Sequence, residues 1–199
     1  MQMAAAVAVD VGGHRAVEGS APPEEFAFVE LFAGIGGFRL GLQALNGRCV
    51  FASEVDPFAA ETYRVNFGEA PAGDILTIDA SSIPSHDILT AGFPCQPFTG
   101  LGDRTGLQGT PGARGMMFWE VYRVAALHRP CAIFLENVAG LLKTNEGDDW
   151  RTIHAALTQL GYSVHHDIVN AVHFVPQCDP AAPEALEPSS AGFVRAVRE

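Results

Sequence analysis

The chain has 199 residues, of which 48% are hydrophobic and 18% are charged. This size and balance are typical of one globular domain with its own core, and no apolar run approaches the ~20 residues of a membrane-spanning helix. The net charge is −11, from 23 acidic and 12 basic residues. This charge has the wrong sign for a domain that grips DNA unaided, because phosphate contacts need lysine and arginine. Either another chain carries the DNA-binding surface, or a small local basic face of this chain provides it.

The cysteines and the N-terminus indicate the compartment. No C-x-x-C pair and no cluster with zinc-ligand spacing occurs among Cys49, Cys95, Cys131 and Cys178. We therefore expect no disulfide and no metal, and reduced thiols suit an intracellular protein. A short Ala/Val run near the N-terminus has no basic residue before it and stops at Asp10, so we expect no signal peptide. Residues 1–25 are rich in Ala, Gly and Pro and predict a disordered tail.

A strand, a glycine-rich turn and a helix form the first predicted unit. Residues 25–32 predict a buried strand, residues 33–37 (Ala-Gly-Ile-Gly-Gly, the glycine turn) follow at once, and residues 38–45 predict a helix. The residues expected to face inward are Leu40, Leu42 and Leu45. Glycines let the backbone approach a ligand, so this unit favours a nucleotide site. The alternative is that the glycines only allow a tight turn of the chain and bind nothing. It is too short for G-x-G-x-x-G, which disfavours a dinucleotide pyrophosphate.

The second predicted strand, residues 49–55, ends in an acid, Glu54. An acid at this point bonds a ribose hydroxyl in many nucleotide folds, whereas without the glycine turn upstream it would be read as a solvated strand end. Asp56 and Pro57 predict the N-cap and the first residue of a helix that runs to about residue 66. The inward stripe of this helix is expected to consist of Ala60, Tyr63 and Phe67.

The segment Gly-Phe-Pro-Cys-Gln-Pro-Phe occupies residues 92–98, directly after a predicted buried strand over residues 87–91. The two prolines end the strand and restrict the backbone around Cys95. The sulfur is therefore expected at the carboxyl end of a strand, where open α/β sheets bind their ligands. A free cysteine is usually a small buried hydrophobe, but this setting favours a nucleophile.

Residues 99–115 contain six glycines and almost no apolar residue. A long loop beside an active site is often a lid, and Arg104 and Arg114 are candidates to contact phosphates when it closes. The alternative is a flexible surface loop without a role. A helix over residues 116–127 is predicted next, with Met117, Val121 and Val124 facing inward.

A further apolar strand, residues 131–135, ends in Glu136-Asn137-Val138. Desolvating a carboxylate is costly, so a strand-end acid of this kind is seldom structural unless it has a partner. Because the carboxyl ends of parallel strands meet at one edge of a sheet, Glu136 is expected to face the same crevice as Cys95.

The last predicted elements are a helix and a half-exposed strand. Asp148 or Asp149 is expected to cap the helix, and residues 162–170 alternate apolar and polar residues as a strand does. His165 and His166 are adjacent and so lie on opposite faces of that strand. We expect both at the surface and neither as a ligand.

These motifs, in this order, resemble those of the DNA (cytosine-5) methyltransferases over residues 26–177. The matched motifs are Phe-Ala-Gly-x-Gly-Gly, Gly-Asp-Ile, Gly-Phe-Pro-Cys-Gln-Pro-Phe and Glu-Asn-Val. The resemblance implies an α/β fold: a Rossmann-like domain that uses S-adenosylmethionine (AdoMet), with a mostly parallel sheet and helices on both faces. Residues 26–177 would be a partial catalytic domain.

The resemblance also implies roles for single residues. Cys95 and Glu136 match the catalytic pair, of which the cysteine attacks carbon 6 of cytosine and the acid supplies a proton at ring nitrogen 3. Asp74 would contact the adenine, although it could be a turn residue alone. The implied cofactor residues are Phe32, Gly34, Ile35, Gly36, Gly37, Glu54, Val55, Asp74, Ile75, Pro94 and Met117. Implied substrate or loop contacts are Gln96, Arg104, Arg114 and Asn137.

The pattern breaks after Gln177. Two arginines that contact the base and the DNA backbone in the family are replaced here by Asp179 and Ala181. The target-recognition domain and the last two motifs are missing, and with them the last strand of the sheet. Residues 178–199 are therefore expected to be a divergent, poorly ordered tail, unless residues 191–197 form a substitute strand.

Three functions compete on this basis. The first is a DNA cytosine-5 methyltransferase of restriction–modification type, acting on a cytosine flipped from duplex DNA, alone or with a complementing polypeptide. The second is an inactive remnant that still binds AdoMet, and the third is a tRNA cytosine-5 methyltransferase. Each implies an intracellular protein, in the cytoplasm or nucleoid of a bacterium or in a eukaryotic nucleus, without a metal and without a membrane.

Overall fold

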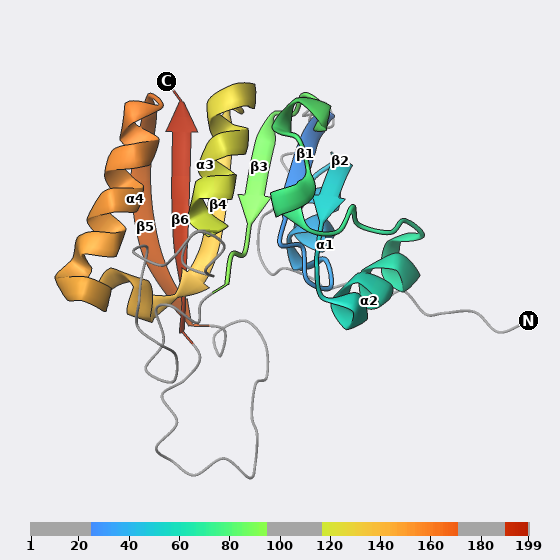
Figure 1. Cartoon of the computed structure of the whole chain (residues 1–199), viewed down its shortest axis with the longest axis horizontal. Helices are drawn as coiled ribbons and strands as arrows, with labels where there is room; N and C mark the ends of the chain where they lie inside the picture. Colours follow the sequence, from blue (N-terminus) through green and yellow to red (C-terminus); the bar gives the residue numbers. More distant parts are fainter. Residues whose placement is uncertain (1–24, 95–116, 171–189, 199) are drawn as a thin grey trace, which may run out of the picture.

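The computed structural model describes residues 25–94, 117–170 and 190–198, and these form a six-stranded sheet with the order β2-β1-β3-β4-β6-β5. Strands β1 to β4 are parallel, whereas β6 is antiparallel to both of its neighbours (Figure 1). The strands are β1 Phe26–Leu31, β2 Gly47–Ser53, β3 Ile88–Ala91, β4 Ala132–Val138, β5 Tyr162–Asn170 and β6 Ser190–Arg198. The expected Rossmann-like, mostly parallel sheet is thus confirmed.

The helices lie on both faces of this sheet, as expected. They are α1 Gly37–Gln43, α2 Pro57–Phe67, α3 Met117–His128 and α4 Asp148–Gln159, with short 3-10 helices η1 Ile75–Thr77, η2 Ala80–Ser82, η5 Ala139–Leu142 and η6 Thr144–Gly147. In Figure 1, α3 and α4 lie over the half of the sheet formed by β4, β6 and β5. The main hydrophobic core is on their face, and in it Ile133 and Leu135 of β4 pack with Val121 and Leu157.

The cap of helix α2 and the buried face of helix α3 agree with the predictions from the sequence. The Asp56 carboxylate caps α2 by accepting hydrogen bonds from the N–H groups of Phe58 (3.0 Å) and Ala59 (2.8 Å), and Pro57 is the first helical residue. The predicted apolar stripe of α3 is confirmed, because Met117, Val121 and Val124 are all buried.

Helix α1 is oriented differently from the expectation. Leu40 and Leu45 were expected to face inward, but they are 62% and 61% exposed, while Arg39 is buried. Arg39 can be buried because its guanidinium is paired with Glu69 and lies over the ring of Phe67, 4.5 Å from the ring centroid. The spacing of the leucines therefore predicted the wrong buried face for this helix.

The expectation that the last strand is missing is wrong, because β6 lies between β4 and β5. The suggestion of a substitute strand over residues 191–197 is confirmed, and the expected poorly ordered tail is corrected for residues 190–198. The physical reason is that β6 satisfies the main-chain groups of both neighbours along its length, and its Val194 and Ala196 are buried in the core.

Two smaller points concern α4 and β5. Gly147, not an aspartate, occupies the N-cap of α4, while Asp148 and Asp149 lie in its first turn. His165 and His166 are exposed, as expected.

In the described ranges, no helix is both long and apolar enough to cross a membrane.

Candidate active site

A cavity of about 210 Å³ lies where the carboxyl ends of the first three strands meet. Most of the predicted cofactor residues line it: Phe32, Glu54, Val55, Asp74, Ile75, Pro94 and Met117. The remaining ones, Gly34, Ile35, Gly36 and Gly37, belong to the glycine turn and do not contribute to its wall. The wall thus combines apolar surface from five segments with two carboxylates, a set suited to a ligand with one apolar ring and several polar groups.

The backbone at the end of β1 is strained. Phe32 has a φ of 55°, which is unfavourable for a side chain of this size, and Gly34 (56°) and Gly36 (94°) also have positive φ. A Cβ atom on Gly36 would lie 2.1 Å from the ring of Phe67. The turn therefore needs glycine at this position for both conformation and space.

Glu54 joins the glycine turn to the start of α2. Its Oε2 accepts a hydrogen bond from the Gly34 N–H (2.7 Å), and its Oε1 accepts one from the Asp56 N–H (2.8 Å). The carboxylate thus has a structural role that the sequence did not indicate. Each oxygen keeps a further lone pair, which leaves the carboxylate able to accept a ligand hydroxyl as well.

Asp74 also has a structural role. Its Oδ1 accepts a hydrogen bond from the Leu76 N–H (3.0 Å) and so caps η1. The two roles considered for Asp74, a turn residue and a cofactor contact, are therefore compatible, because the same side chain caps a turn and lines the cavity.

Glu136 lies on β4, with its side chain half-buried. A Cβ atom on Gly92 would lie 3.5 Å from Oε2 of Glu136, so the carboxylate is next to the segment that leads from β3 toward Cys95. Burial raises the pKa of the Glu136 carboxyl. The other predicted residues of this region, Cys95, Gln96, Arg104 and Arg114, lie outside the described residues.

Asn137 is buried next to Glu136 and ties two strand ends together. Its amide Nδ2 donates a hydrogen bond to the carbonyl oxygen of Phe93 (3.0 Å), and its Oδ1 accepts one from the Val138 N–H (2.9 Å). The sequence indicated a substrate or loop contact for this residue. In the structure it anchors the main chain two residues before Cys95, and the implied substrate or loop contact stays a prediction.

Sequence reasoning did not identify Ser53, Gly73 and Leu76 as cavity residues. Ser53 is 1% exposed, and its hydroxyl has no hydrogen-bond partner in the part of the chain that the structure describes. Its place directly before Glu54, at the end of a predicted strand, was the available signal. A serine at a strand end is too common to be assigned from that signal alone.

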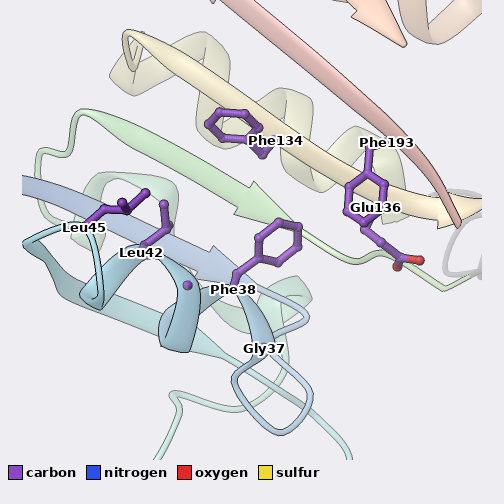
Figure 2. Close-up of a pocket in the computed structure, with 8 residues that line it drawn as sticks. Gly37, Phe38, Leu42, Leu45, Phe134, Glu136 and Phe193 are labelled. Atoms are coloured by element: carbon purple, nitrogen blue, oxygen red, sulfur yellow. The ribbon is translucent and has the colours of Figure 1, made fainter. Parts of the chain in front are cut away.

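A second, larger hollow of about 580 Å³ lies on the sheet face opposite α3 and is called here the apolar groove. Figure 2 shows Phe38 and Leu42 of α1, with Leu45 just after the helix, on one side and Phe134, Glu136 and Phe193 on the strands across from them. Along β4 the residues on this face are only half-buried, while those on the α3 face are buried. No sequence signal separated the two faces, because all residues of the strand before Glu136 are apolar.

Solved structures share this fold. The Dnmt2 methyltransferase of S. pombe has a TM-score of 0.63 at 23% identity, over 88% of this chain and 50% of that chain. The methyltransferase EhMeth of Entamoeba histolytica has a TM-score of 0.68 at 19% identity, over 88% and 54% of the two chains. At such identities the likeness shows the fold alone.

Sequence comparisons identify the family. The Type II methyltransferase M.MspI of Moraxella sp is 46% identical over 154 residues, which are 77% of this chain and 36% of that protein. M.HpaII of Haemophilus parainfluenzae is 48% identical over 159 residues, or 77% and 44%. The chain thus spans less than half the length of these curated relatives. The family model for the C-5 cytosine-specific DNA methylases matches residues 26–178, and this chain belongs to that family.

Proposed function

We propose that this chain is the catalytic part of a DNA cytosine-5 methyltransferase, which moves a methyl group from AdoMet to carbon 5 of cytosine. One observation carries the proposal. Most of the cofactor residues expected from the sequence line one cavity at the strand ends, and on the neighbouring strand the half-buried Glu136 carboxyl lies against Gly92, three residues before Cys95.

The residues of the cavity fit AdoMet. Phe32 and the apolar side chains of Val55 and Ile75 offer surfaces for the adenine ring, and the Glu54 and Asp74 carboxylates accept hydrogen bonds from hydroxyl and amino groups. The cofactor supplies an electrophilic methyl group when it is bound. The protein holds it at the end of the strand that leads toward Cys95.

Carbon 5 of cytosine is a poor nucleophile, so the protein must activate the ring. The Cys95 thiolate forms a bond to carbon 6, and the electron pair displaced from the ring double bond makes carbon 5 nucleophilic. Glu136 holds a proton at ring nitrogen 3, which neutralises the charge that develops there. Once carbon 5 carries the methyl group, loss of its proton expels the thiolate and restores the aromatic ring.

The raised pKa of Glu136 supports this role. A carboxyl with an ordinary pKa would be almost fully ionised at neutral pH and could not donate. Burial favours the protonated form, and further removal of water when a base enters would favour it more. The target base must leave the duplex to reach this position.

The test is transfer of labelled methyl from AdoMet to cytosine-containing duplex DNA by the whole chain, beside the Cys95→Ala variant. Label in the DNA from wild type alone is the expected result. Equal label from both proteins would overturn the mechanism. AdoMet binding by both proteins without transfer by either would instead favour the inactive remnant, for which Asp179 and Ala181 at the two arginine positions are the supporting observation. A parallel reaction with tRNA in place of DNA tests the third function, that of a tRNA cytosine-5 methyltransferase.

We also infer that a second polypeptide segment completes the enzyme by covering the apolar groove. Sheets of parallel strands are ordinarily buried on both faces, yet β4 is fully buried on one face only. The groove is lined by Phe38, Leu42, Leu45, Phe134 and Phe193, which is a surface for an amphipathic helix. The occupant that we propose is a complementing polypeptide with the chemistry of an amphipathic helix, because the wall of the groove is apolar.

Reconstitution tests this inference with a matched pair of variants. The partner to supply is the remaining C-terminal part of a relative such as M.MspI, expressed as a separate chain. Leu42→Asp, which places a charge in the groove, should abolish its capture, whereas Leu40→Asp on the exposed side of α1 should not. Equal capture by the two variants would show that the groove is not the docking surface. The bacterial Type II relatives favour a bacterial cytoplasm as the location of the complex.

A further inference from the structure

A buried carboxylate on β1 contacts the start of α1, outside the chemistry proposed above. Glu30 is 1% exposed. Its Oε1 accepts a hydrogen bond from the main-chain N–H of Arg39 (3.3 Å), and its Oε2 accepts one from the hydroxyl of Tyr63 (3.2 Å). A charged group at such a site is costly to bury, so its contacts must compensate for the lost water.

Helix α1 has no cap of its own. Gly36 occupies the N-cap and offers no side chain, and the first turn contains no acidic residue. The free N–H groups at the start of a helix need an acceptor. Glu30 supplies one from the neighbouring strand, and so joins the helix to the sheet directly after the glycine turn.

The Glu30 carboxylate is itself held by a chain of polar contacts that reaches the surface. Arg39 donates through Nη1 to the Tyr63 hydroxyl (3.1 Å), and its guanidinium pairs with Glu69 (3.3 Å), which is largely exposed. The thiol of Cys49 lies 3.7 Å from the same hydroxyl. The position of Glu30 is therefore set by residues from α1, α2 and β2 together.

The same residues pack against the glycine turn. A Cβ atom on Gly36 would lie 3.2 Å from the Tyr63 ring and closer still to Phe67, and the Arg39 guanidinium lies over both rings. The polar chain and the turn therefore form one packed unit. A change in the contact between Glu30 and α1 would therefore also change the position of the glycine turn.

We propose that Glu30 is a positioning residue for the cofactor site: its carboxylate holds the start of α1, and with it the glycine turn, against β1. The inference rests on the function proposed above only in assigning the glycine turn to the cofactor site. Glu30 does not line the cavity, and it acts through the main chain of α1.

This arrangement makes the site sensitive to pH. Burial raises the pKa of Glu30 to about 7, although the N–H of Arg39, the Tyr63 hydroxyl and the Arg39 guanidinium each lower it. The titratable and charged groups around it are Arg39 on α1, Tyr63 on α2 and Cys49 on β2. The ionised carboxylate accepts both hydrogen bonds more strongly than the neutral acid does, so the hold on α1 should tighten as the pH rises through about 7.

Overall stability should change in the opposite direction. Because the folded-state pKa lies above the ordinary value of 4.5, the folded chain keeps this proton longer than the unfolded chain does. The contribution of Glu30 to stability is therefore full below about pH 4.5 and is lost as the pH rises to about 7. A rise in local order together with a fall in global stability is a signature that a purely structural residue would not give.

The experiment compares wild type with Glu30→Gln, and uses Glu25→Gln as the control for loss of one charge at an exposed ion pair. Amide hydrogen exchange of residues 34–43 is followed from about pH 6 to pH 8, corrected for the intrinsic exchange rate. In wild type the protection of this segment should rise roughly five- to tenfold across that range, as loss and gain of a helix cap would predict. In Glu30→Gln protection should stay flat, and Glu25→Gln should follow wild type.

AdoMet affinity, measured by calorimetry over the same pH range, is the second readout and should change in parallel with protection. Flat protection in wild type, or the same pH dependence in Glu30→Gln, would overturn the proposal. A failure of wild type to bind AdoMet would contradict the proposed function, while the exchange data would still decide the role of Glu30. If Glu30→Gln does not fold, Tyr63→Phe replaces it as the test variant, because it removes only one of the two hydrogen-bond donors to Glu30. The pH-dependent change in protection should then be smaller than in wild type but should not vanish.

Discussion

The cavity at the strand ends and the apolar groove differ in the groups that form their walls. In the cavity, Glu54 and Asp74 already accept hydrogen bonds from the main chain, and the glycine turn beside it is held by Glu30. The groove is lined by aromatic and leucine side chains, and among the described residues that line it Glu136 is the one acid. The polar groups of the first site are thus held by contacts within this chain, whereas the second is a half-buried apolar face for which we propose a covering partner.

Glu136 belongs to the groove wall and is also the proposed acid, so changing it should have the largest effect. Glu136→Gln should lower methyl transfer by roughly 10²- to 10⁴-fold, the range for loss of a general acid. In wild type, transfer should decline as the pH rises past the raised pKa of Glu136, because only the protonated carboxyl donates. Single-turnover rates against pH would show this. A decline that persists in the variant would assign the pH dependence to another group.

The glycine turn allows a sharp test of how tightly the region beside the cavity is packed. Gly36→Ala should lower the free energy of unfolding by about 3 kcal/mol, since the new methyl group meets the Phe67 ring and the φ of 94° is unfavourable for alanine. Gly37→Ala is the matched control, because a Cβ there meets nothing within 4 Å. Denaturant unfolding measures both variants. Equal stability would mean that the turn relaxes freely.

Loss of the strand-end anchor should cost somewhat less. Asn137→Ala removes the buried hydrogen bond that the Asn137 amide donates to the Phe93 carbonyl, which should destabilise the fold by about 2 kcal/mol. It should also slow methyl transfer without changing AdoMet affinity, because the anchor holds the segment before Cys95. Kinetic constants and calorimetry separate the two effects. Weaker AdoMet binding would instead link Asn137 to the cavity.

The smallest effect is expected in the groove itself. Leu45 is 61% exposed, so Leu45→Gln should change the free energy of unfolding of this chain by less than about 0.5 kcal/mol. The same substitution should weaken binding of a complementing chain measurably. A large loss of stability in the isolated chain would mean that the groove is already packed, and the contrast between the two sites would fail.

Several elements of this fold could be predicted because their signals are local. The capping of α2 by Asp56 and the apolar stripe of α3 depend on residues within one or two turns of each other. The convergence of Glu54 and Pro94 on one cavity was also predictable, since strand ends of a parallel sheet meet at one edge, whereas Asp74 was expected there only from the resemblance. The orientation of α1 was not, because the burial of Arg39 depends on Glu69 and Phe67, which lie far along the sequence.

Short motifs and local periodicity were therefore enough to identify the family, the order of the elements through β5, and the residues that stand at the strand ends. Only the tertiary structure decided that β6 fills the position between β4 and β5, that Asn137 anchors Phe93, and that Glu30 holds the start of α1. These features arise from contacts between segments distant in the chain. Such contacts depend on complementary shape and hydrogen bonding across the fold, which no local pattern of residues encodes.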